Sequence, residues 1–168
     1  MILSAAQILA EKIAAELQPF CSRLEIAGSI RRRRPEVRDI DLVCIPKGYA
    51  GRTGILSRCA QVSKLIKEGD QYVVFMLPGG FQLDLWFAHE DIPNLLDVTP
   101  GNWGMLLLAR TGSADFIIWL ARTAKVRGLH FNPHKGILRG EQVIASRTEE
   151  EIFSALGLPF IRPEDRER

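Results

Sequence analysis

Four stretches of the chain carry apolar residues at the three-to-four-residue spacing of an amphipathic helix. The predicted helices cover, in chain order, residues 4–18, 55–67, 113–128 and 148–157. Ser4 with Gln7 and Thr148 with Glu151 have the spacing of capping boxes, and Ser113 is a candidate N-cap. Glycines close the last three of these helices.

Apolar runs between these helices predict strands. They cover residues 24–27, 39–45, 72–77 and 81–87, with short strand-like pieces between residues 131 and 144. Pro78-Gly79-Gly80 separates the third run from the fourth and favours a hairpin. Residues 92–104 contain two prolines and two glycines and are the best candidate boundary between two lobes.

Composition narrows the class of protein. A chain of 168 residues can form one compact body or two small lobes, and its 46% hydrophobic and 25% charged residues are ordinary for a soluble globular protein. No apolar run reaches the roughly 20 residues of a membrane span, and we expect no secretory signal. The three cysteines form no CxxC pair, which favours reduced thiols in a cytosolic setting over a disulfide framework or a zinc site.

Positive charge is concentrated in two regions although the net charge is only +2. Four consecutive arginines, Arg31–Arg34, are followed closely by Arg38. From Arg110 to Arg139 there are six basic residues and a single acid, Asp115. Two separated basic regions fit a polyanionic partner, and the alternative is a pair of solvated faces.

Three aspartates occupy the polar side of two predicted strands. Asp39 and Asp41 are two residues apart, so both side chains point to one face, and Asp84 lies between apolar positions of the run 81–87. If these strands are neighbours, three carboxylates converge, and divalent cations would relieve their repulsion. Hard oxygen ligands favour Mg²⁺, and two ions about 3.5–4 Å apart suit in-line phosphoryl transfer. The alternative is that they are ordinary strand and edge acids.

Gly28-Ser29 precedes this acidic pair by a loop. A glycine at a strand end allows backbone N–H groups to approach a phosphate, and the serine adds a hydroxyl donor. Arg31 and Arg32 follow at once and could meet a triphosphate with fork geometry. Taken alone, a Gly-Ser dipeptide is usually just a turn. The tryptophans Trp86 and Trp119 are interpreted as packing residues.

The order G-S-I-R-R, D-I-D-L-V and L-D-L is similar to the nucleotidyltransferase superfamily typified by DNA polymerase beta. Thr111-Gly112-Ser113 ahead of a helix resembles the T-G-S turn of family X DNA polymerases, and residues 128–132 and 148–166 resemble that family's C-terminal lobe. The resemblance covers about residues 24–166 and is weaker between residues 47 and 71.

The resemblance implies an α+β fold: a nucleotidyltransferase palm over residues 1–95, with a mixed or antiparallel sheet and two helices, and a small α+β thumb over 96–168. It implies template-directed addition of nucleotides to a primer 3′-hydroxyl. Asp39 and Asp41 would hold both of two Mg²⁺ ions, with Mn²⁺ as a substitute, and Asp84 the catalytic one. Gly28, Ser29 and Arg32 would meet the triphosphate, and Thr111-Gly112-Ser113 the sugar and base. The expected contacts to DNA phosphates are Arg110, Arg122, Lys125, Arg127, Lys135 and Arg139.

The partners implied are a primer-template or gapped DNA duplex and a nucleoside triphosphate. We expect a monomer without membrane association, in the cytoplasm and nucleoid-associated or viral, that fills short gaps in DNA repair. We also expect no lyase activity, because no N-terminal lyase domain is seen. Ala109-Arg110 stands where many members have an aromatic pair, and Ile117 and Ala121 where they have Asn and Arg. Weak sugar discrimination and low fidelity are therefore expected.

Two other functions remain open from the sequence. One is nucleotidyl transfer to a different acceptor, such as a small molecule, a tRNA or a protein. The other is nucleic-acid binding without catalysis. The T-G-S turn and the closing P-E-D-R segment favour the DNA polymerase over the first, and the acidic trio argues against the second.

Overall fold

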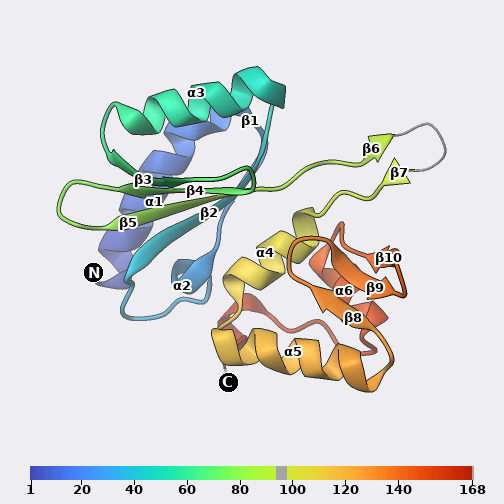
Figure 1. Ribbon diagram of the computed structural model, residues 1–168. Coiled ribbons are helices and arrows are strands. Elements are labelled where there is room, and N and C mark those ends of the chain that lie inside the picture. The colour runs from blue at the N-terminus through green and yellow to red at the C-terminus, as the bar shows by residue number, and fades with distance from the viewer. Residues whose placement is uncertain (94–97, 168) are drawn as a thin grey trace. The chain divides into compact units, whose positions relative to one another are not determined.

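The computed structural model describes residues 1–93 and 98–167. The chain forms two compact units, Met1–Ala88 and His89–Arg168 (Figure 1). The domain boundary expected between residues 95 and 96 falls within residues 94–97, outside the described residues.

A five-stranded mixed sheet forms the first unit. Its strands, in chain order, are β1 (Cys21–Ile26), β2 (Asp39–Pro46), β3 (Lys64–Glu68), β4 (Tyr72–Met76) and β5 (Gln82–Phe87). In space the order is β1-β2-β5-β4-β3, with β2 and β5 parallel and the other neighbours antiparallel. The central strands β2 and β5 are far apart in the sequence: β2 ends at Pro46, and β5 begins 36 residues later, at Gln82.

Helices cover one face of this sheet. They are α1 (Leu3–Leu17), which continues into the 3₁₀ turn η1 (Gln18–Phe20), and α3 (Gly48–Ala60), as Figure 1 shows. The short helix α2 (Gly28–Arg31) follows β1 directly. Apolar side chains of α1 and α3 pack with alternate residues of β2, β4 and β5 in a single core. The residues between those alternate positions point to the opposite face.

Two local predictions in this unit were wrong. The helix expected over residues 55–67 instead begins at Gly48 and ends at Ala60, and residues 64–68 form edge strand β3, where Ile66 is 52% exposed. Pairing of β3 with β4 outweighs the helical pattern. Position 54, inside α3, requires a glycine, because a Cβ there would come within 2.3 Å of the Phe20 ring. The capping box at Ser4 is also wrong: α1 begins at Leu3 without a side-chain cap.

The second unit packs three helices against a small antiparallel sheet. The helices are α4 (Trp103–Thr111), α5 (Ala114–Val126) and α6 (Glu149–Ala155), and the strands are β8 (His130–Asn132), β9 (Gly136–Arg139) and β10 (Gln142–Ala145). The short pair β6 (Ile92–Pro93) and β7 (Val98–Thr99) precedes them, and the 3₁₀ turn η2 (Pro163–Asp165) follows. Helix α4 lies in a region to which the sequence pattern assigned no helix. The N-caps Ser113 and Thr148 are confirmed, since each hydroxyl accepts from the backbone N–H three residues on.

Together these elements confirm the expected α+β class with a mixed sheet. The three cysteines are free and buried. Across the described residues, none of the helices combines the length and the hydropathy that a membrane span requires.

Candidate functional site

The acidic face of the first unit lies on the central strands β2 and β5. In the parallel register Asp41 is directly opposite Asp84, and Asp39 is opposite Gln82. All three aspartates are half-buried, whereas the intervening Ile40 and Leu83 are 0% and 1% exposed in the helix-covered core. Because neighbouring strands lie about 4.8 Å apart, the register sets the backbones of Asp41 and Asp84 side by side. Both side chains point to the face opposite α1 and α3.

Two side chains of β5 donate hydrogen bonds to these acids. Nε2 of Gln82 lies 2.7 Å from Oδ1 of Asp84, and Nε1 of Trp86 lies 3.3 Å from Oδ1 of Asp41. Sequence reasoning assigned no role to Gln82 and interpreted Trp86 as packing. Their position two residues before and two residues after Asp84, hence on the same face, was the signal that could have identified them.

Trp86 is held in place from the neighbouring strand. Its ring stacks on that of Tyr72, the residue directly opposite on β4, with centroids 4.7 Å apart and an interplanar angle of 18°. The ammonium of Lys67 lies 4.8 Å from the centre of the Tyr72 ring. A row of side chains therefore runs across β3, β4 and β5 and ends at the carboxylate of Asp41.

Gly28 lies directly against Asp41 on the acidic face. Its φ of 61° is left-handed, and a Cβ placed on it would lie 2.1 Å from Oδ2 of Asp41. The pairing of β1 with β2 causes this proximity, since the N–H of Ala27 donates to the carbonyl of Asp41 at 2.8 Å. Only glycine satisfies both the backbone conformation and the space beside Asp41.

The next residue, Ser29, has a buried hydroxyl for which the described residues provide no hydrogen-bond partner. A buried hydroxyl usually has a partner, so an unsatisfied one beside an acidic site is consistent with a ligand that completes it. Arg31 and Arg32 follow and are half-buried. The N–H of Arg32 donates to the carbonyl of Gly28, and the segment closes with Arg33 at a left-handed φ of 57°.

In the second unit, Thr111-Gly112-Ser113 forms the turn between α4 and α5. Thr111 is fully buried, and Ser113 caps α5. The N–H of Ser113 donates to the carbonyl of Arg166 at 3.0 Å, so the C-terminal segment fixes this turn. Arg166 is itself fully buried and donates from both terminal nitrogens to Glu149 at the start of α6.

The basic residues expected to meet DNA are all in the second unit. Five of them are exposed, and Arg110, near the end of α4, is half-buried. The exposed five are Arg122, Lys125, Arg127, Lys135 and Arg139. Arg122 and Lys125 are three residues apart on α5 and therefore share one face of that helix.

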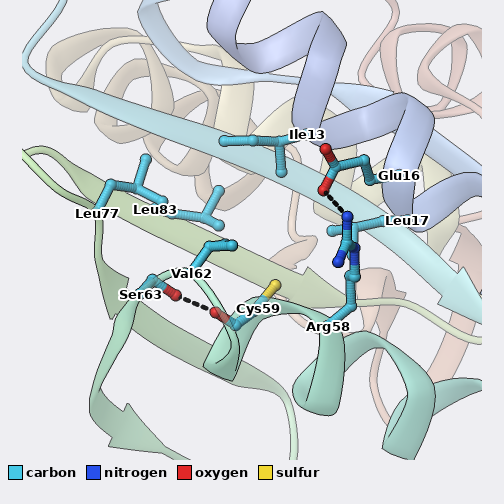
Figure 2. A pocket seen from close by; sticks show the side chains of 9 residues that line it. All are labelled: Ile13, Glu16, Leu17, Arg58, Cys59, Val62, Ser63, Leu77 and Leu83. Carbon is cyan, nitrogen blue, oxygen red and sulfur yellow. Dashed lines mark hydrogen bonds and ion pairs between the residues drawn. The ribbon is translucent and has the colours of Figure 1, made fainter.

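A cavity of about 20 Å³ lies in the first unit, on the side of the sheet that α1 and α3 cover (Figure 2). Its lining comes from α1, α3 and their neighbours and includes Leu17, Cys59 and Leu83. Glu16 and Arg58, which form an ion pair at 3.0 Å, also line it. This volume holds about one water molecule. It is too small for a nucleotide.

The acidic face supplies ligands suited to a hard divalent cation. Within residues 1–93 and 98–167, no set of three His, Cys, Asp or Glu side chains is grouped closely enough to hold a metal ion. Mg²⁺ is usually held by one or two carboxylates together with substrate phosphates and water. The register-paired carboxylates of Asp41 and Asp84 fit that donor set.

Evidence on the class of protein comes from the second unit. Residues 106–167 match the family model of the DNA polymerase beta thumb. This match, together with the relative described next, confirms the resemblance to family X DNA polymerases that the sequence shows.

One known protein is similar to the chain over most of the chain's length. The chain is 28% identical over 163 residues to the DNA polymerase/3'-5' exonuclease PolX of Bacillus subtilis (strain 168). The aligned region takes in 95% of this chain but only 27% of that relative. The chain thus spans about a quarter of the relative's length.

Proposed function

We propose that the chain catalyses template-directed transfer of nucleotides to a primer 3′-hydroxyl, in the manner of a family X DNA polymerase, with the first unit as palm and the second as thumb. The single observation that carries the proposal is the opposition of Asp41 and Asp84 on the face of the sheet that α1 and α3 leave uncovered. The matches to a polymerase thumb and to PolX support it. We further propose that the chain acts as a monomer in short-gap filling during DNA repair, in the cytoplasm.

The acidic face would do the chemistry. Asp41 and Asp84, with Asp39 joining them once substrate phosphates complete the coordination, would hold two Mg²⁺ ions, and these would neutralise charge on the phosphates and on the departing pyrophosphate. Asp84 would face the primer 3′-hydroxyl. Gly28 leaves room for phosphate oxygens beside Asp41, the buried Ser29 hydroxyl would donate to one of them, and Arg32 would add positive charge.

The second unit would select the nucleotide and hold DNA. Thr111-Gly112-Ser113 would lie beside the sugar and base, with Arg166 fixing the turn. The basic residues of α5 and of the β8–β10 sheet would contact DNA phosphates without reading sequence. The side chains at Ile117 and Ala121 cannot form hydrogen bonds to a base pair, so we propose low fidelity. Ala109-Arg110 replaces the aromatic pair of many family members, so we also propose weak sugar discrimination.

The test is primer extension on a duplex with a one-nucleotide gap, in Mg²⁺ and in Mn²⁺, with each of the four templating bases in turn. Extension that follows the templating base supports the proposal. Transfer that ignores the template, or that modifies only a tRNA, protein or small molecule, identifies a nucleotidyltransferase with another acceptor. Binding of the duplex without turnover in either metal contradicts catalysis.

A further inference from the structure

Strand β5 presents a donor, an acid and a second donor in a row on the acidic face. Gln82, Asp84 and Trp86 are two residues apart, so the pleat directs all three the same way. Gln82 donates to Asp84 on its own strand at 2.7 Å, and Trp86 donates to Asp41 on the neighbouring strand at 3.3 Å. Strand β5 therefore donates one hydrogen bond to its own Asp84 and one to Asp41 of β2.

Both donors are neutral. An amide or indole N–H fixes the direction of a carboxylate without adding positive charge that would compete with a bound cation. For Asp41 the two oxygens are placed differently, because Oδ1 receives the Trp86 bond while Oδ2 faces Gly28. The orientation of Asp41 is thus set from two sides.

The Trp86 donor is braced by packing. The indole ring stacks on the Tyr72 ring, and the Lys67 ammonium lies over that same Tyr72 ring. These contacts restrict the indole ring. The bond from Trp86 is longer than the usual 2.7–3.2 Å for N–H···O, whereas the bond from Gln82 is short. The two donors should therefore contribute unequally, Gln82 more than Trp86.

We propose that Gln82 and Trp86 are positioning residues that orient Asp84 and Asp41 for a divalent cation. The proposal rests on the proposed function, since it assigns a purpose to the same acidic face.

The experiment compares Gln82→Met and Trp86→Phe, which remove the N–H donors and keep most of the side-chain bulk. The matched controls are Gln142→Met on β10 and Trp119→Phe on α5, which make the same chemical changes in the second unit. Mn²⁺ affinity is measured by electron paramagnetic resonance of the free ion, with a non-hydrolysable nucleoside triphosphate present. Single-nucleotide gap filling then gives kcat and the nucleotide KM across a range of Mn²⁺ concentrations.

Loss of an orienting residue around a metal site typically costs 10–100-fold in metal affinity, so Gln82→Met should weaken Mn²⁺ binding by about that factor. Trp86→Phe should weaken it by roughly tenfold or less, and kcat of both variants should recover at high Mn²⁺. Both controls should stay within about twofold of the wild-type chain. A purely structural role would lower the melting temperature without recovery by Mn²⁺.

The outcomes separate the two proposals. Wild-type Mn²⁺ affinity in both donor variants overturns the positioning role, whatever the enzyme does. Weakened Mn²⁺ binding in the donor variants, with no turnover by the wild-type chain, keeps the positioning role and contradicts the polymerase proposal. Absence of Mn²⁺ binding by the wild-type chain overturns both.

Discussion

Carboxylates are used in two different ways in the two units. In the second unit, Glu149 is 6% exposed and accepts hydrogen bonds from both terminal nitrogens of Arg166. Arg166 is fully buried and lies between the rings of Phe153 and Phe160. In the first unit, Asp41 and Asp84 are only half-buried, and each receives an N–H from a neutral side chain.

The difference separates an acid that holds the fold from acids that we propose bind a metal ion. A guanidinium in two-point contact with a buried carboxylate cancels its charge and leaves it little freedom. An indole or amide donor orients a carboxylate and contributes no charge. Partial exposure then leaves the acids of the first unit reachable by a cation. Five variants would break or sharpen this contrast.

Asp84→Asn should have the largest effect on activity. It keeps the shape and removes the charge, so gap filling should fall by about ten-thousandfold, which is over 5 kcal/mol of barrier. The guanidinium midpoint of unfolding should stay the same or rise, because a like charge beside Asp41 is gone. Asp70→Asn, on the exposed β3–β4 turn, is the control and should retain activity. Activity of Asp84→Asn above a tenth of wild type would remove Asp84 from the chemistry.

Arg166→Met should have the largest effect on stability. Removing one partner of a buried ion pair leaves Glu149 buried and unpaired and costs about 3–5 kcal/mol. Hydrogen exchange of the α5 and α6 amides should accelerate accordingly, while amides of the first unit stay unchanged.

The double variant Glu149→Met with Arg166→Met sharpens this result. It removes both charges, so protection should return close to wild type. If the double variant is as unstable as Arg166→Met, the loss comes from packing against Phe153 and Phe160 and not from the unpaired acid.

Gly28→Ala should have an intermediate effect. A left-handed residue other than glycine costs about 1–3 kcal/mol, and here the new Cβ would also push against Asp41. Gly48→Ala is the control, since its φ of 65° is similar and no atom lies within 4 Å of the added Cβ. Urea unfolding should show the smaller loss for Gly48→Ala, and activity should fall only in Gly28→Ala. Equal activities would mean that Asp41 does not need its present position.

The smallest expected effect is a loss of stability at high pH, and it comes from Cys59 on the helix-covered side of the sheet. Burial raises the pKa of Cys59 from an ordinary 9.0 to about 12. The folded chain therefore keeps a proton that the unfolded chain loses, and stability declines as pH rises from 9 toward 12. At pH 10 this costs about 1.4 kcal/mol, which Cys59→Ala should abolish. The comparison is the change in unfolding free energy between pH 8 and pH 10, and identical changes in both chains would show that the thiol is not the cause.

The sequence alone predicts the polar face of this site because strand alternation is strictly local. Asp39, Asp41 and Asp84 alternate with apolar residues, and the predicted strands 39–45 and 81–87 match β2 and β5 within a residue. The register that sets Asp41 opposite Asp84 is not local, since it depends on pairing between distant strands. For the same reason the pattern could not assign Trp86 to Asp41, and it extended a helix through β3.

The most direct measurement is a crystal structure with Mn²⁺ and a non-hydrolysable nucleoside triphosphate, in which anomalous scattering locates the ion. The account predicts an anomalous peak within coordinating distance of carboxylate oxygens from both Asp41 and Asp84, with the triphosphate against Gly28 and Ser29. Manganese bound elsewhere, with those two carboxylates bare of metal, would contradict it.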